Sequence, residues 1–132
     1  MSTRDTLSGR YGAVSAGSAL AAGAAMRVGH RLYTAGQAGR NRDTGQMGDV
    51  ADQVDWALRN LDAIAKAGGT SLRRAIKVTM ILRDDVTDMA AVNAAYEAHF
   101  PDVLPARTTF FVSRLKNPEM LVEIEAVILV DA

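Results

Sequence analysis

The chain has no cysteine, few aromatic residues and no excess of charge of either sign. Without cysteine it can form no disulfide, no thiolate metal ligand and no cysteine nucleophile, which fits a reducing compartment such as the cytoplasm. Lysine plus arginine and aspartate plus glutamate each number 15. A nucleic-acid-binding protein needs excess positive charge to attract phosphates, so we expect neither RNA nor DNA as a partner.

Histidine and long apolar runs are also scarce. His30 and His99 are the only histidines, and they lie too far apart to resemble a metal-ligand motif. No window approaches the roughly 20 apolar residues of a membrane helix. The segment 15–25 is rich in Ala, Gly and Ser, which makes it less apolar than the core of a signal peptide. We therefore expect no metal site, no membrane association and a cytoplasmic location.

The composition nevertheless supports one hydrophobic core, because 48% of the 132 residues are hydrophobic. Residues 1–19 carry few large apolar side chains and are predicted to be a flexible N-terminal arm. The folded domain is then expected over residues 20–132. There are no internal repeats and no linker within it.

The pattern of apolar residues predicts the order strand, strand, helix, strand, helix, strand, strand. Turn and loop signals lie at Gly29-His30 and over the glycine-rich segment 36–48. Alternating or β-branched residues predict strands, and apolar residues at helical spacing predict helices. The expected strands are 24–28, 31–35, 75–83, 107–113 and 121–130, and the expected helices are 49–67 and 89–99.

This order is typical of an α+β fold, a single two-layer domain in which two helices cover one face of a mixed sheet. The other face would be bare. The residues assigned to it include apolar side chains, which self-association would hide from water. They are Ile81, Phe111, Val127 and Leu129.

Two candidate sites for chemistry lie on the last two strands. Arg107 and Thr109 share a face at the start of one strand, where a guanidinium can bind a carboxylate with two hydrogen bonds. A structural salt bridge is the alternative reading. Glu123 and Glu125 share a face of the last strand, and a partly buried acid there would hold a water or pair with Arg107. The alternative is that both glutamates face water.

Two further segments carry weaker signals. Ala35-Gly36 ends a strand, where glycine permits either a close approach to a ligand or a plain turn. Asn93 and Tyr96 lie within the second helix, and core packing is the simplest reading of Tyr96.

Four short motifs together resemble the RidA family, also called YjgF or L-PSP-like. The resemblance runs from about Met26 to Val130. The motifs occur in the family's order and nearly at its spacing. They are Val28-Gly29-X5-Ala35-Gly36-Gln37, Val92-Asn93-Ala94-Ala95-Tyr96, Pro105-Ala106-Arg107 and Val122-Glu123-Ile124-Glu125-Ala126.

The resemblance implies a chorismate-mutase-like homotrimer with small-molecule sites in the clefts between subunits. It implies hydrolysis of a carboxylate-bearing enamine or imine to a keto acid and ammonia, with no bound cofactor. Arg107 would then bind the substrate carboxylate, and Glu123 would position the attacking water. The other implied substrate contacts are Thr109, Ala35, Gly36 and Asn93. A non-catalytic protein that binds a 2-keto acid at the same clefts is the alternative.

The chain departs from the family pattern at several positions. Ala22 stands where a tyrosine is usual, Ala35 where a serine is usual and Thr109 where a cysteine is common. The pocket wall is therefore expected to be roomier and less polar. A substrate larger or more apolar than 2-aminoacrylate would suit it.

Overall fold

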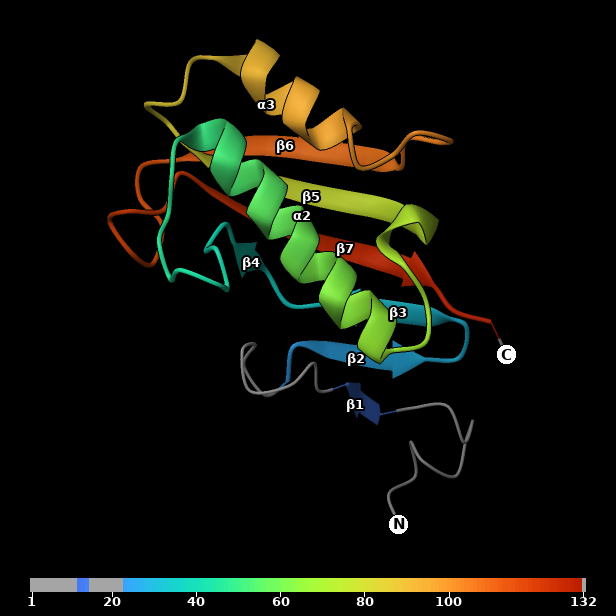
Figure 1. Ribbon diagram of the computed structural model, residues 1–132. Helices are drawn as coiled ribbons and strands as arrows, with labels where there is room; N and C mark the ends of the chain where they lie inside the picture. Colours follow the sequence, from blue (N-terminus) through green and yellow to red (C-terminus); the bar gives the residue numbers. More distant parts are fainter. Residues whose placement is uncertain (1–11, 15–22, 132) are drawn as a thin grey trace.

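The computed structural model describes residues 12–14 and 23–131, and Figure 1 shows a sheet crossed by two helices. The order of the elements confirms the α+β prediction, with three short additions: β1, β4 and the 3-10 helix η1. The elements are β1 (Gly12–Val14), β2 (Ala25–Val28), β3 (Arg31–Thr34), β4 (Gln37–Ala38), α2 (Val50–Ala67), η1 (Leu72–Arg74), β5 (Ala75–Arg83), α3 (Met89–Glu97), β6 (Ala106–Val112) and β7 (Val122–Leu129).

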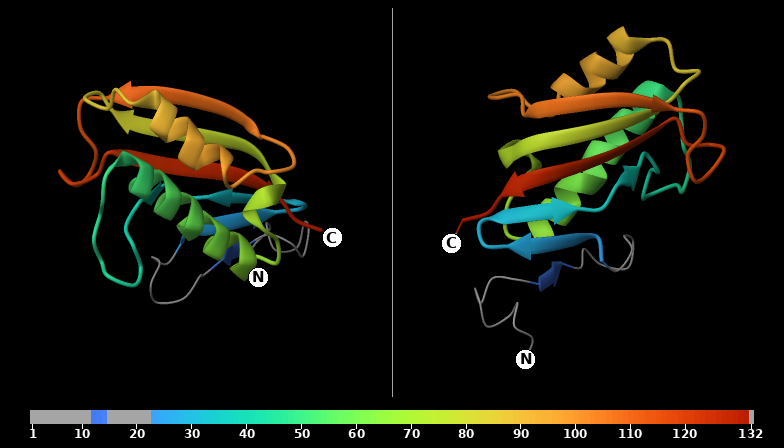
Figure 2. Two further views of the ribbon diagram at one scale, coloured as in Figure 1. Left: turned by 45° about the horizontal axis from the view of Figure 1, so that its top comes forward. Right: turned by 180° about the vertical axis from the view of Figure 1, so that it is seen from behind.

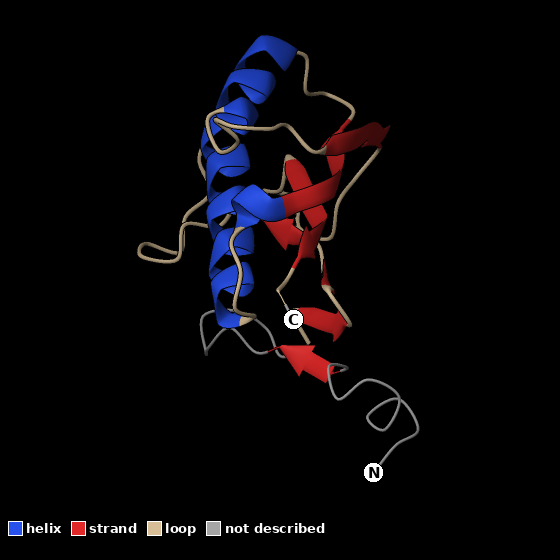
Figure 3. Cartoon of the chain, turned by 90° about the vertical axis from the view of Figure 1, so that its right-hand side faces the viewer, coloured by secondary structure: helices blue, strands red, loops and turns tan. Residues whose placement is uncertain are grey.

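The strands form one mixed sheet in the order β1-β2-β3-β7-β5-β6, with β4 paired to β7. β5 and β6 run parallel, because α3 connects them, and the other described pairs are antiparallel. Both helices lie on one side of the sheet, as the side view in Figure 3 shows. The view from behind in Figure 2 shows the opposite face with no helix over it.

The helix α2 ends at the predicted residue and begins one residue later than predicted, at Val50. Asp49 caps its start, accepting a hydrogen bond from the backbone N–H of Asp52, and Gly68 caps its end. Its apolar stripe packs on the sheet, with Leu58, Leu61 and Ile64 fully buried. The polar Gln53 is also buried, and its side-chain amide links the loop before the helix to the segment before β7. It donates to the carbonyls of Gly48 and Glu119 and accepts from the backbone N–H of Leu121.

The strand β5 has the predicted bounds but not the predicted alternation throughout. An irregularity in its pairing with β7, between Ala75 and Lys77, inserts one residue. Ala75 therefore packs against the core, whereas Ile76 is 39% exposed. Strict alternation along 75–83 would place Ile76 on one buried face with Val78, and it does not, because a bulge changes the face of every residue before it.

The segment 36–48, predicted as a loop, contains the short strand β4. Gln37 and Ala38 pair with Ile124 and Glu123 of β7. Gly39 follows directly, and a Cβ there would lie 2.1 Å from the backbone oxygen of Gln53 on α2. The glycine therefore permits a close approach of this segment to the helix.

The side of the sheet that no helix covers, here called the open sheet face, carries several apolar side chains. Pairing registers place Phe110 opposite Ile81 on this face and Phe111 opposite Leu82 on the helix face. The assignment of Phe111 to the open face was therefore wrong, and Phe110 takes its place. The apolar residues of the open sheet face include Met26, Val28, Tyr33, Ile81, Phe110, Val112, Val127 and Leu129.

Three residues of the predicted N-terminal arm form β1, which pairs with β2 at the end of the sheet. The rest of that prediction, and the expectation about Ala22, concern residues outside the described part of the chain. Within the described part, neither helix is long and apolar enough to cross a membrane.

Candidate functional site

Arg107 lies on the edge strand β6, and two residues of α3 contact its side chain. Arg107 pairs in register with the buried Val78, so its side chain lies on the helix face. Its Nη2 donates a hydrogen bond of 2.9 Å to Oδ1 of Asn93. The guanidinium carbon also lies 4.7 Å from the centre of the Tyr96 ring, within cation–π range. The hydrogen bond leaves the other N–H groups of Arg107 without a partner among the described residues.

Two hydroxyls near Arg107 are buried without a hydrogen-bond partner among the described residues. One is Oγ1 of Thr109, two positions along the same face of β6, and the other is the hydroxyl of Tyr96. Buried hydroxyls are nearly always bonded, so these two are exceptions within the contact layer between β6 and α3. Burial raises the pKa of Tyr96 to about 12, although the charge of Arg107 opposes the rise. Its hydroxyl is therefore neutral at physiological pH.

The other predicted catalytic residue, Glu123, lies on the open sheet face. It pairs in register with Ile81 of β5 and with Ala38 of β4, and its side chain is half-buried. Gly36 lies beside it, because a Cβ on Gly36 would come within 2.7 Å of Cδ of Glu123. The backbone turn at Gly36 thus fits closely against this carboxylate. Glu125 shares the face but is exposed.

The idea that Glu123 pairs with Arg107 within one chain was wrong. Thr109 and Ile124 both register with Met80 on the helix face, so Glu123 must point to the opposite side of the sheet. The predicted residues therefore form two groups. Arg107, Thr109 and Asn93 lie between β6 and α3, whereas Glu123 and Gly36 lie on the open sheet face, next to the exposed Ala35.

Sequence reasoning treated Tyr96 as core packing and missed its contact with Arg107. Tyr96 is indeed buried, with its ring centre 5.0 Å from that of Phe100. The signal that could have revealed the contact is its spacing. Asn93 and Tyr96 are three residues apart on one helix and so face the same strand.

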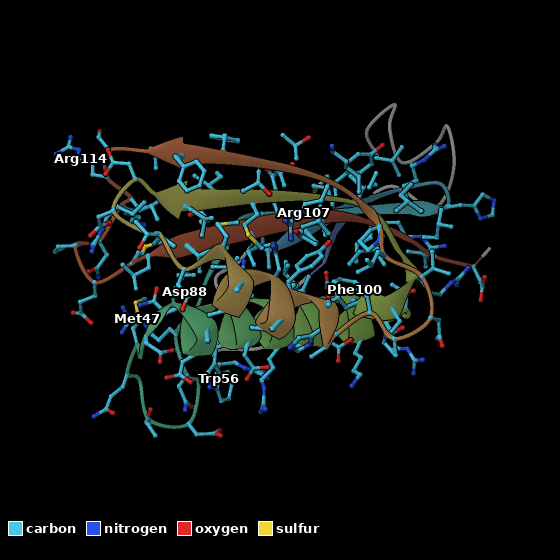
Figure 4. All side chains as sticks on the ribbon, turned by 90° about the horizontal axis from the view of Figure 1, so that it is seen from above. Met47, Trp56, Asp88, Phe100, Arg107 and Arg114 are labelled. Atoms are coloured by element: carbon cyan, nitrogen blue, oxygen red, sulfur yellow. The ribbon has the colours of Figure 1, made fainter. Side chains whose placement is uncertain are left out.

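A sizeable hollow lies elsewhere, on the outer side of α2. It measures about 710 Å³, and Figure 4 shows Trp56 pointing away from the sheet there, on the far side of the helices from Arg107. Arg59 and Lys66 are each already paired with an aspartate at 2.9 Å. Two of the three lysine and arginine side chains that line the hollow are thus neutralised, and we place the candidate site at Arg107. The hollow on the outer side of α2 is lined by Arg42, Asp43, Trp56, Arg59, Asp62, Ala63, Lys66 and His99.

Comparison with known proteins identifies relatives of this chain. The sequence model of the endoribonuclease L-PSP family matches residues 16–130. A RutC family protein of Pyrococcus horikoshii is 41% identical over 78% of this chain and 82% of its own. The 2-iminobutanoate/2-iminopropanoate deaminase of Rattus norvegicus is 36% identical over 78% of this chain and 75% of its own.

A solved structure of the YjgF gene product from E. coli matches the fold. It is 33% identical, with a TM-score of 0.75 over 88% of this chain and 92% of its own. Sequence and structure agree on the same relationship, and the resemblance seen in the four motifs is confirmed. The chain belongs to the endoribonuclease L-PSP family, also known as the RidA or YjgF family.

Proposed function

We propose that this protein hydrolyses a small carboxylate-bearing enamine or imine to a keto acid and ammonia. Arg107 binds the substrate carboxylate, and Glu123 positions the attacking water. The reaction takes place in clefts between the subunits of a homotrimer and needs no bound cofactor. The relatives named as 2-iminobutanoate/2-iminopropanoate deaminases support this reaction class.

The arrangement of Arg107 is the observation that carries the proposal. One N–H of the guanidinium is bonded to Asn93 and one of its faces rests on Tyr96, which leaves the other N–H groups for a ligand. A planar guanidinium with free N–H groups matches the geometry of a carboxylate. We propose Thr109, two positions after Arg107 on the same face of β6, as a further substrate contact.

The chemistry requires water to add to the imine carbon. A C–O bond forms while the C=N π electrons move to nitrogen, which takes up the proton that the attacking water gives up through Glu123. Glu123 accepts a hydrogen bond from the attacking water and raises its nucleophilicity. In the tetrahedral adduct the hydroxyl proton then passes to nitrogen, the C–N bond breaks to release ammonia, and the carbonyl of the keto acid forms. Water is the only co-reactant.

The two groups of residues meet only if two chains share a site, since Arg107 and Glu123 lie on opposite faces of one sheet. In the proposed trimer, Arg107 of one subunit faces Glu123 of its neighbour. Arg107 lies on β6, the edge strand, which a neighbouring chain can approach. Covering the apolar open sheet face provides the driving force for assembly.

We expect light scattering at low micromolar concentration to report a mass of about 42 kDa, three times the 14.1 kDa of one chain. Phe110→Asp should shift the protein to monomer, because it places a charge within the buried interface. Phe111→Asp is a matched control on the other face, since the two side chains are 43% and 49% exposed. A monomeric wild-type protein would contradict both the interface and the shared cleft.

Substrate size provides a direct test of the function. Imines can be generated from alanine, leucine and phenylalanine with an amino-acid oxidase, and ammonia release can be followed for each. Ala35 leaves space at the site, so we expect the leucine and phenylalanine imines to react faster than the alanine imine. Equal rates for all three would contradict the roomier pocket wall, and ammonia release that Glu123→Gln does not lower would overturn the hydrolase.

The same experiment separates two other readings. A protein that binds a 2-keto acid but releases no ammonia above background would be a non-catalytic binder, a reading that the alanines at positions 22 and 35 favour. RNA cleavage, which the family description suggests, finds little support in this chain. The net charge is zero and the chain has two histidines, one of which, His99, is bonded to Asp55 at 2.7 Å.

A further inference from the structure

We propose that Tyr96 is a positioning residue whose ring holds the guanidinium of Arg107 ready for a carboxylate. The inference rests on the proposed function and extends it to a residue that does not touch the substrate. Asn93 is the second positioning contact, because its Oδ1 accepts from Nη2 of Arg107. Together the ring and the amide set the plane and the rotation of the guanidinium.

The geometry restricts Arg107 in two independent ways. The Tyr96 ring, 4.7 Å from the guanidinium carbon, limits movement perpendicular to the guanidinium plane. The hydrogen bond to Asn93, at 2.9 Å, limits rotation within that plane. A free arginine side chain has many rotamers, and immobilising it on binding weakens affinity. When the fold has already immobilised Arg107, the substrate does not have to do so.

Tyr96 is itself a rigid support. It is 3% exposed and packs in a tilted arrangement against Phe100. Its hydroxyl has no hydrogen-bond partner among the described residues, so the contact with Arg107 is made by the ring. Burial raises the pKa of Tyr96 to about 12. The side chain therefore stays neutral, and its contact with Arg107 does not change across the physiological pH range.

Three variants of the full-length protein test this role. Tyr96→Leu removes the ring, Tyr96→Phe keeps the ring without the hydroxyl, and Phe100→Leu removes a neighbouring ring that has no cation–π contact with Arg107. Phe100→Leu is the matched control for lost core packing. Each variant is compared in two measurements, the Nε–H signal of Arg107 by ¹⁵N NMR and the steady-state constants for the leucine imine.

We expect Tyr96→Leu to abolish the ring-current shift of the Arg107 signal and to raise KM about 5- to 30-fold, the equivalent of one cation–π contact. The value of kcat should change less than KM, because Glu123 and the water are untouched. Tyr96→Phe should keep both the shift and KM, and Phe100→Leu should keep the shift and raise KM no more than about twofold.

Two results would overturn the role of Tyr96. One is an unchanged Arg107 signal and KM in Tyr96→Leu, and the other is a loss in Tyr96→Phe as large as that in Tyr96→Leu. The NMR signal needs no turnover, so it reports on Tyr96 even if the wild-type protein hydrolyses no imine. Failure of the proposed function and failure of the positioning role are thus separate outcomes.

Discussion

Replacing Glu123 with glutamine is expected to lower kcat for imine hydrolysis by about 100-fold or more while changing KM little. The substitution preserves shape and most hydrogen bonding but removes the negative charge that activates the water, and such a group contributes about 10²- to 10⁴-fold. Glu125→Gln is the matched control, two residues away on the same face and exposed. Steady-state kinetics on the same imine compares the two.

A second variant displaces the carboxylate of Glu123 without replacing the residue. In Gly36→Ala the new Cβ would lie 2.7 Å from Cδ of Glu123, so the carboxylate must move. The clash is with the flexible end of a side chain, so stability should change little while kcat falls. If Glu123→Gln and Glu125→Gln lower kcat equally, Glu123 has no special role in holding the water.

Replacing Arg107 with lysine is expected to raise KM for the imine roughly 10- to 100-fold and to leave the melting temperature nearly unchanged. Lysine keeps the charge but loses the planar fork, and one charge-assisted contact is worth about 1.5–3 kcal/mol. The fold should tolerate the change because Arg107 is only half-buried.

Arg59→Lys is the control for Arg107→Lys, because it alters an arginine in a comparable setting. Arg59 also stacks on an aromatic ring, at 4.9 Å from Trp56, and pairs with Asp55, but it lies on the outer side of α2. The KM of the Arg59→Lys protein should match that of the wild type. An Arg107→Lys protein that unfolds, or that binds substrate as well as the Arg59→Lys protein, would show that Arg107 is structural.

Local signals predicted most of the fold. The helix α2 follows from its apolar period, the aspartate before it and the glycine after it, all of which lie within one segment of the chain. The β2–β3 hairpin follows from Gly29, whose φ of 58° is the left-handed conformation that a tight turn favours. Such signals act between residues a few positions apart, so the sequence displays them directly.

Pairing register could not be read in the same way. The bulge at Ala75–Lys77 and the facing of Phe110 and Phe111 depend on which residue of one strand meets which residue of the next. That choice is made by contacts between distant segments. A shift of one residue exchanges the two faces, so the composition of the open sheet face was predicted only in part.

The sequence by itself determined the family, the α+β class and the residues proposed for chemistry, because motifs and local periodicity are properties of neighbouring residues. Only the tertiary structure decided that Arg107 and Glu123 lie on opposite faces of the sheet, and that Asn93 and Tyr96 hold Arg107. Side chains alternate along each strand, but the register between β5, β6 and β7 sets which of them share a face. That register, which forms when the sheet assembles under α2 and α3, divides the candidate site between two faces.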